Sequence, residues 1–170
     1  MLKLAPPDSH HLEAAEGWLE LGAHLEADAE LDKIAPRLRD HPDVLELRWQ
    51  IYALDNRWPA CVDIAQAIIQ AAPNRALGWI HQSFALHCLK RTQEAYHHLM
   101  PVAVRFPKDW TIHYNLACYC AQLGHLQEAQ EWFQQAMQIN PRQTQAGAVD
   151  DPDLKPLWDS MSNTIWKKLK

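Results

Sequence analysis

The sequence is poor in features that would mark an enzyme, an exported protein or a membrane protein. It has only 5 glycines in 170 residues, with no glycine-rich phosphate loop, no HExxH zinc motif and no G-x-S-x-G nucleophile motif. No apolar run approaches the roughly 18 residues needed to span a bilayer. Residues 1–11 lack the basic and then apolar order of a signal peptide. We therefore expect a non-catalytic cytoplasmic protein that makes no use of a membrane.

Cysteine is scarce and is not arranged for metal binding. The four cysteines lie in segments of helical periodicity and form no CxxC pair: Cys61, Cys88, Cys118 and Cys120. The best metal set would join His87 and Cys88 to the cysteines at 118 and 120, but zinc ligands usually have more compact spacing. A nucleophilic pair of Cys118 with His113 is also weak, because residues five apart are not neighbours on a helix. We interpret the cysteines as reduced packing thiols and expect no metal and no cofactor.

The charge is distributed unevenly along the chain. The formal net charge is −5, and residues 1–60 carry 12 acidic against 6 basic side chains, whereas the remainder carries 9 against 10. Proteins that bind nucleic acid concentrate Lys and Arg on one face. The acidic N-terminal part argues against nucleic acid as a partner, and the short basic tail of Lys167, Lys168 and Lys170 does not change this.

Proline recurs at a fixed period. Pro73, Pro107 and Pro141 are spaced 34 residues apart, and each closes a segment with two stretches of helical periodicity. Proline cannot continue a helix but suits the first turn of the next one, so each proline marks a boundary between repeats. The 48% hydrophobic content and 8 tryptophans are typical of a packed helical fold. The pattern predicts helices at 11–27, 30–39, 43–54, 58–71, 75–89, 92–105, 109–122 and 126–138.

Small and apolar residues recur in the same phase as the prolines. In the last repeat they are Leu116, Ala117, Leu123, Gly124, Ala129, Phe133, Ala136 and Pro141. One period earlier stand Trp79, Ala95, Leu99, Val102 and Pro107, and before them Leu45, Tyr52, Cys61, Ala65, Ile68 and Pro73. Small residues at 61, 95 and 129 suit the place where two helices approach closely. This pattern resembles the tetratricopeptide repeat family, although no single repeat carries every motif residue.

The resemblance implies an all-α fold, a right-handed superhelix of antiparallel helix pairs. It places full repeats at 42–75, 76–109 and 110–143. Trp18, Leu21 and Gly22 indicate a degenerate first repeat at 10–41, whose second helix Pro36 should bend or shorten.

The end of the chain departs from the repeat pattern. Residues 142–147 are polar and without helical period, and a C-terminal capping helix is predicted at 150–170. Its apolar stripe consists of Leu154, Leu157, Trp158, Met161, Ile165 and Leu169. The alternative for this stripe is an amphipathic tail that binds a partner.

In this family the first helix of each pair lines a concave groove that usually binds a peptide. Carried over by position, the groove residues are Asp43, Glu46, Leu47 and Gln50 in the second repeat, Leu77, Ile80, His81 and Phe84 in the third, and Thr111, Tyr114, Asn115 and Cys118 in the fourth. The groove would change from acidic to apolar along its length, which favours a ligand with a basic end and an apolar anchor. The alternative is that Ile80 and Phe84 only pack between repeats.

Two functions remain open from the sequence. The first is a non-catalytic interaction scaffold or adaptor that binds a protein or peptide in the concave groove. The second is a small tetratricopeptide chaperone, similar to those of type III secretion, which dimerise through N-terminal helices and hold a client segment. The oligomeric state, monomer or dimer, would help to separate the two.

Overall fold

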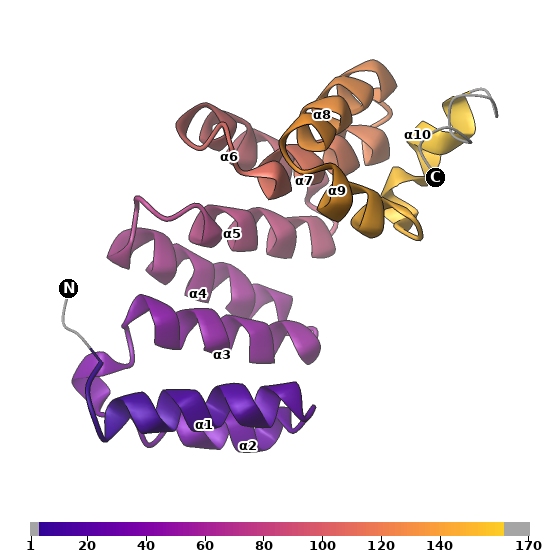
Figure 1. Cartoon of the computed structure of the whole chain (residues 1–170). Coiled ribbons are helices and arrows are strands. Elements are labelled where there is room, and N and C mark those ends of the chain that lie inside the picture. The colour runs from indigo at the N-terminus through magenta and orange to yellow at the C-terminus, as the bar shows by residue number, and fades with distance from the viewer. Residues whose placement is uncertain (1–3, 162–170) are drawn as a thin grey trace. The chain divides into compact units, whose positions relative to one another are not determined.

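The computed structural model describes residues 4–161, and over that range the chain is helical throughout (Figure 1). The first helices of successive pairs are α1 (Asp8–Glu20), α3 (Pro42–Leu54), α5 (Leu77–Cys88) and α7 (Trp110–Gln122). The second helices are α2 (His24–Leu31), α4 (Trp58–Ala71), α6 (Thr92–Arg105) and α8 (Leu126–Ile139). The predicted all-α fold of consecutive helix pairs is confirmed. None of the described helices is long and apolar enough to cross a membrane.

The chain divides into two compact units within α5. The N-terminal unit consists of Met1–Ala85 and the C-terminal unit of Leu86–Lys170. The N-terminal unit holds the first two helix pairs and most of α5, and the C-terminal unit holds α6 and everything after it. Each unit has its own apolar interior, described separately below.

The interior of the N-terminal unit consists of two clusters. The first joins α1, α2 and α3 through Ala15, Ala27, Leu31, Ile34, Leu38, Val44, Leu47 and Ile51. The second joins α3, α4 and α5 through Leu45, Trp49, Cys61, Ala65, Ile68 and Ala85. Cys61 is fully buried, as expected for a small residue where helices approach closely. The groove candidate Leu47 belongs to the first cluster and is 5% exposed, so it is a core residue.

A glycine allows α5 to approach α4 closely. A Cβ added at Gly78 would lie 2.9 Å from Cγ2 of Ile68 and 3.1 Å from the backbone nitrogen of Ile69. Real side chains do not tolerate contacts this short without a shift of the neighbouring helix. The absence of a side chain at Gly78 therefore sets how closely these two helices pack.

The C-terminal unit is built around α7. Nine consecutive or near-consecutive residues of this helix are buried, and α7 contacts α6 on one side and α8 on the other. The repeat positions Ala95, Ala129 and Ala136 are fully buried, and Phe133 is nearly so. The second helices α4 and α6 have the bounds that the proline period predicts, 58–71 and 92–105.

The first pair differs from the sequence prediction. The predicted helix at 11–27 is wrong, because α1 ends at Glu20 and α2 begins at His24. Gly22 lies between them with φ of +75°, a conformation that ends helices and favours glycine. The predicted second helix at 30–39 is also wrong. In the structure α2 ends at Leu31, and Pro36 begins a separate 3₁₀ turn, η1 (Pro36–Leu38).

The segment after the fourth repeat is helical where none was predicted. Helix α9 (Pro141–Ala148) covers most of the polar stretch at 142–147. Asn140 caps it by accepting a hydrogen bond from the backbone N–H of Gln143, and Pro141 occupies the first turn. Only Thr144 and Ala148 of this helix are buried. With only these two buried residues, the segment shows no clear helical repeat of apolar side chains in its sequence.

The chain then folds back onto the fourth repeat. A 3₁₀ turn, η2 (Pro152–Leu154), leads into α10 (Lys155–Ser160), and these contact α7 and α8. Leu154 and Leu157 are fully buried, and Trp158 packs edge-to-face on Phe133 with 5.0 Å between ring centroids. The predicted capping helix therefore begins later than 150 in the structure. Its remaining stripe residues, Ile165 and Leu169, lie outside the described residues.

Candidate functional site

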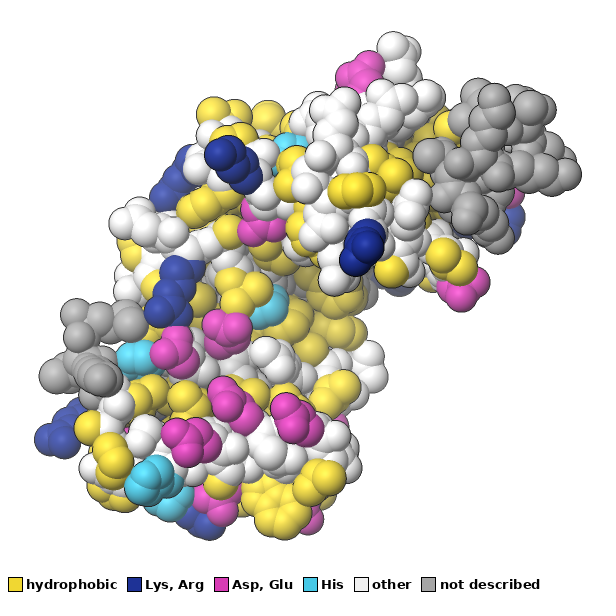
Figure 2. Space-filling model, in the orientation of Figure 1, with side chains coloured by type: hydrophobic (Ala, Val, Ile, Leu, Met, Phe, Trp, Pro, Cys, Tyr) yellow, Lys and Arg dark blue, Asp and Glu magenta, His cyan; other side chains and the backbone are white. Residues whose placement is uncertain are grey.

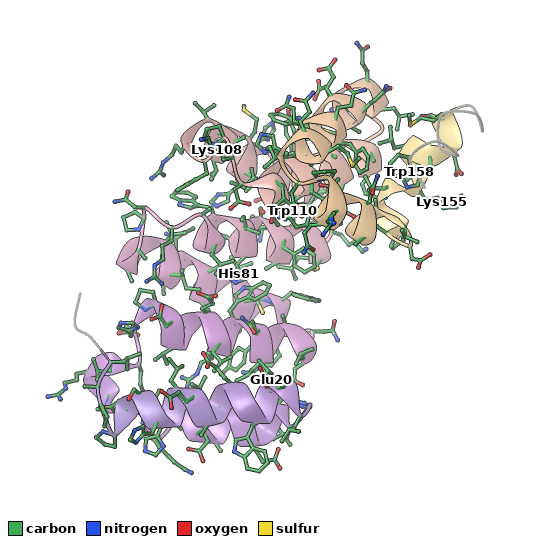
Figure 3. The ribbon with its side chains drawn as sticks, in the orientation of Figure 1. Glu20, His81, Lys108, Trp110, Lys155 and Trp158 are labelled. Carbon is green, nitrogen blue, oxygen red and sulfur yellow. The ribbon has the colours of Figure 1, made fainter. Side chains whose placement is uncertain are left out.

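Acidic side chains gather on α1 and α3, the first helices of the two helix pairs of the N-terminal unit. Glu13, Glu16 and Glu20 of α1 and Asp43 and Glu46 of α3 form what we call the acidic face (Figure 2). Both helices carry these side chains at i, i+3 and i+7, with Gln50 of α3 completing the second row, so each row lies along one side of its helix. The α1 row was missed by the sequence analysis, although its spacing is visible in the sequence. Glu20 marks the end of this row (Figure 3).

The acidic face is short of counter-charges. Of the five carboxylates of this face, only Asp43 lies against a basic side chain among the described residues: Arg75 at 2.6 Å and the His41 ring at 3.6 Å. Partial burial raises the pKa of the Glu46 carboxyl most, and the charges of Asp43 and Glu16 raise it further, whereas the charge of Arg75 lowers it in part. These carboxylates therefore repel one another, and a cation placed between α1 and α3 would relieve that repulsion.

Aromatic rings form a cluster next to the acidic face. His81 of α5 stacks on Trp49 of α3 with 3.7 Å between ring centroids and an interplanar angle of 7°. Phe84 packs edge-on against Trp49 and Trp58, and it remains 38% exposed. Burial lowers the pKa of His81 to about 4, so the ring is neutral at physiological pH. Phe84 thus both packs within the repeats and presents an aromatic edge.

The other α5 candidates are less accessible. Ile80 is buried, and Leu77 is half-buried at the first turn of the helix. Because Ile80 is only 8% exposed, little of its side chain is open to a ligand. The surface left by α1, α3 and α5 therefore consists of the acidic face, Gln50, the edge of His81 and the exposed part of Phe84.

The fourth-repeat candidates lie in a different environment. Tyr114 and Cys118 of α7 are only 8% and 4% exposed. The Tyr114 hydroxyl donates a hydrogen bond of 2.6 Å to Oδ2 of Asp151, and the Cys118 thiol donates to the same oxygen at 3.6 Å. The chain's own C-terminal segment therefore occupies these two positions. Thr111 lies at the start of α7, where its amide is capped by Asp109, and Asn115 is half-buried.

A second aspartate of this segment is held beside the first. Oδ2 of Asp153 lies 3.0 Å from Nε2 of His87, and its backbone oxygen accepts a hydrogen bond from the Gln122 side chain at 2.9 Å. The hydrogen bond with His87 lowers the pKa of Asp153. Burial raises the pKa of both Tyr114 and Cys118. Both groups are therefore protonated at neutral pH and act as donors.

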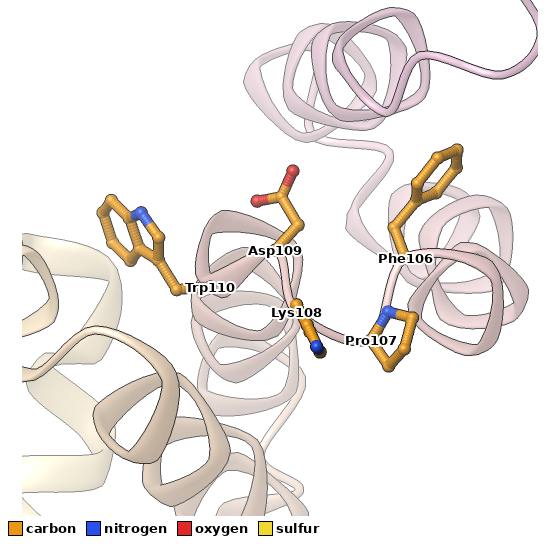
Figure 4. Close-up of a pocket in the computed structure, with 5 residues that line it drawn as sticks. All are labelled: Phe106, Pro107, Lys108, Asp109 and Trp110. Carbon is orange, nitrogen blue, oxygen red and sulfur yellow. The ribbon is translucent and has the colours of Figure 1, made fainter.

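Two shallow hollows on the C-terminal unit do not bring together side chains that would suit a catalytic or ligand site. One, of about 490 Å³, follows the turn between α6 and α7 and is lined by Phe106, Pro107, Lys108, Asp109 and Trp110 (Figure 4). Its one acidic group, Asp109, is engaged as the cap of α7. A second hollow follows the turn between α7 and α8. No group of three or more His, Cys, Asp or Glu among residues 4–161 is arranged to hold a metal ion.

The comparisons with known proteins agree with the helix-pair architecture. Residues 110–143 match the tetratricopeptide repeat family model. The chain therefore contains a tetratricopeptide repeat at residues 110–143, and its fold is that of tetratricopeptide structures. The match covers the fourth repeat, in which the sequence pattern was clearest. A sequence search of curated proteins found no match.

Solved tetratricopeptide structures resemble most of this repeat protein. MamA (41-end) from Desulfovibrio magneticus RS-1 superimposes with a TM-score of 0.72 at 17% identity, covering 98% of this chain and 95% of that one. PilF of Pseudomonas aeruginosa gives a TM-score of 0.73 at 16% identity, covering 95% and 68%. YrrB, described as a TPR protein with an unusual peptide-binding site, gives 0.63 at 14%, covering 88% and 81%. At these identities the likeness shows the fold.

Proposed function

We propose that this tetratricopeptide repeat protein is a non-catalytic scaffold or adaptor that binds a basic segment of another protein. The binding surface is the acidic face with Gln50 and the exposed edge of Phe84. The observation that carries the proposal is the row of carboxylates on α1 and α3, of which only Asp43 has ion-pair partners among the described residues. Lys or Arg side chains would supply the missing counter-charge.

Phe84 supplies the apolar part of the proposed surface. Its ring is held by Trp49 and Trp58, so little conformational freedom is lost when a ligand covers its exposed edge. A ligand that spans from α1 to α5 therefore needs basic residues at one end and an apolar side chain at the other. The first helices of tetratricopeptide pairs commonly present such binding residues, which supports placing the site on α1, α3 and α5.

Selection from a random peptide library tests this function directly. The full chain is immobilised, and bound peptides are sequenced after washing. We expect the recovered peptides to be enriched in Lys and Arg together with one aromatic or aliphatic residue. Recovery of acidic peptides, or of sequences without charge preference, would contradict the proposal.

A second candidate function rests on apolar side chains at one end of the N-terminal unit. Leu21 and Leu25 are 77% and 71% exposed at the α1–α2 turn, and Trp18 and Leu54 are also exposed. A small chaperone that dimerises through its N-terminal helices would cover these side chains. A molar mass in solution decides between the two. A dimer that Leu21→Ser with Leu25→Ser converts to monomer supports the chaperone, and a monomer at all concentrations counts against it.

A further inference from the structure

The segment Val149–Leu154 is held on α7 chiefly by carboxylates. The Asp151 carboxylate accepts hydrogen bonds from Tyr114 and Cys118, and the Asp153 carboxylate is hydrogen-bonded with His87. The backbone oxygen of Asp153 accepts a hydrogen bond from Gln122. All four partners are side chains of α5 and α7 within the C-terminal unit. We call this group, Tyr114, Cys118, Gln122 and His87, the α7 site. It contacts the segment through polar groups, while Leu154 and Leu157 fill the adjoining core.

The α7 site is built from hydrogen-bonding side chains that face the acceptors of the segment. The Tyr114 hydroxyl and the Cys118 thiol both point to one carboxylate oxygen of Asp151. His87 is positioned by its other ring nitrogen, which lies 3.0 Å from the Thr92 hydroxyl, and by its contact with the ring of Tyr119. His87 is therefore held in place by groups that do not belong to the segment. A buried donor set of this kind discriminates for carboxylates, because a ligand without them leaves the donors unsatisfied.

The bound segment has a defined shape. Asp151 caps its own turn by accepting a hydrogen bond from the backbone N–H of Asp153 at 2.9 Å, and Pro152 fixes the turn between them. Two carboxylates two positions apart are thereby presented to side chains of α5 and α7. Gly147 lies beside Tyr114, where a Cβ would come within 3.4 Å of the ring. The tyrosine is thus covered from two directions by residues 147–151.

We propose that the α7 site is a recognition site for a paired-aspartate turn, which the chain fills with its own Asp151 and Asp153. The site accepts an acidic segment of the Asp-Pro-Asp type from another protein only when the internal segment is withdrawn. Its ligand class is opposite in charge to that of the acidic face. The two sites would therefore bind different partners, and failure of one proposal leaves the other standing.

Alkylation of Cys118 reports whether the internal segment closes the site. Purified full chain is treated with N-ethylmaleimide, and the rate at each cysteine is followed by peptide mass spectrometry. We expect the double variant Asp151→Asn with Asp153→Asn to react at Cys118 at least about tenfold faster than the wild type. Cys120, fully buried on the same helix, should keep its slow rate. An unchanged Cys118 rate would overturn the proposal.

Matched variants separate opening of the site from loss of structure. Asp150→Asn removes an exposed carboxylate of the same turn that has no bond among the described residues, and it should react as the wild type does. If Cys120 accelerates together with Cys118, the double variant has unfolded. The single variant Asp151→Asn is then compared in the same way, and selective acceleration of Cys118 supports the proposal while equal rates at both cysteines overturn it.

The ligand class is tested by adding the segment in trans. The probe is the acetylated and amidated peptide of residues 149–158, VDDPDLKPLW, with the double variant as receptor. We expect this peptide to slow Cys118 alkylation, and the peptide with Asn at positions 151 and 153 to have little effect. Equal protection by both peptides, or by neither, would contradict recognition of the aspartate pair. Binding of basic peptides to the acidic face should be the same in the wild type and the double variant.

Discussion

The hydroxyl of Tyr114 donates a 2.6 Å hydrogen bond to Asp151, 37 residues later in the chain. Tyr114 is one of the predicted groove residues, and here its partner is the chain's own C-terminal segment. The predicted groove residues of the two units therefore differ in their surroundings. The N-terminal unit presents unsatisfied carboxylates, whereas the α7 positions are already engaged.

Removal of the Tyr114 hydroxyl should destabilise the C-terminal unit. Tyr114→Phe leaves the ring in place but removes a buried donor to a carboxylate, which costs about 2 kcal/mol of unfolding free energy. Urea denaturation followed by circular dichroism measures the change. Tyr96→Phe is the matched control, because its more exposed hydroxyl lies 3.4 Å from Glu128, and it should cost less than about 1 kcal/mol. Equal losses of unfolding free energy in the two variants would show that the hydrogen bond to Asp151 stabilises the fold no more than an exposed one.

Gly78 should resist substitution, and Gly17 should not. Gly78→Ala places a Cβ 2.9 Å from Ile68 and should destabilise the fold by about 1–3 kcal/mol, because α4 must shift. Gly17→Ala adds a methyl group to the interior of α1 with nothing within 4 Å and should stabilise by about 0.5–1 kcal/mol. Thermal or urea unfolding of both variants measures the pair. A stabilising Gly78→Ala would mean that α5 does not approach α4 as closely as described.

His81 should make the stability depend on pH. Its pKa is about 4 in the folded protein against 6.5 for an unperturbed histidine, so the unfolded chain binds the proton more readily. Stability should therefore fall as the pH decreases from 6.5 to 4, by up to roughly 3 kcal/mol from this residue. His81→Phe keeps a ring on Trp49 but cannot titrate. Unfolding measured across this pH window should show a flatter profile for the variant, and parallel profiles would contradict the assignment.

The sequence predicted helix positions correctly where the spacing of the apolar residues and the position of the prolines indicated the same boundary. The bounds of α4 and α6 were predicted because Pro73 and Pro107 end their repeats and the small residues Cys61 and Ala95 fix the phase. The α1–α2 break was misplaced because the apolar period runs past Gly22, whose positive φ ends the helix locally. Helix α9 was missed because only Thr144 and Ala148 are buried.

The candidate site was less accessible to sequence reasoning. Asp43, Glu46 and Gln50 could be placed on one side of a first helix from the repeat phase alone. The contribution of Glu13 and Glu16 depends on α1 lying beside α3, which the degenerate first repeat obscured. The bond between Tyr114 and Asp151 joins segments outside the repeat pattern, so no periodicity indicates it. Assignment of the groove residues to ligand binding stays a prediction.

The affinity of a selected basic peptide for charge-reversed variants shows whether the acidic face binds basic ligands. Fluorescence anisotropy is measured with the wild type, with Glu16→Lys/Glu46→Lys, and with a control of equal charge change, Asp63→Lys/Glu131→Lys, at exposed positions of α4 and α8. We expect the affinity to fall at least about tenfold for the first pair, by a factor that becomes smaller as salt is added, and to change within about twofold for the control. Equal losses in both variants, or none in the first, would contradict binding at the acidic face.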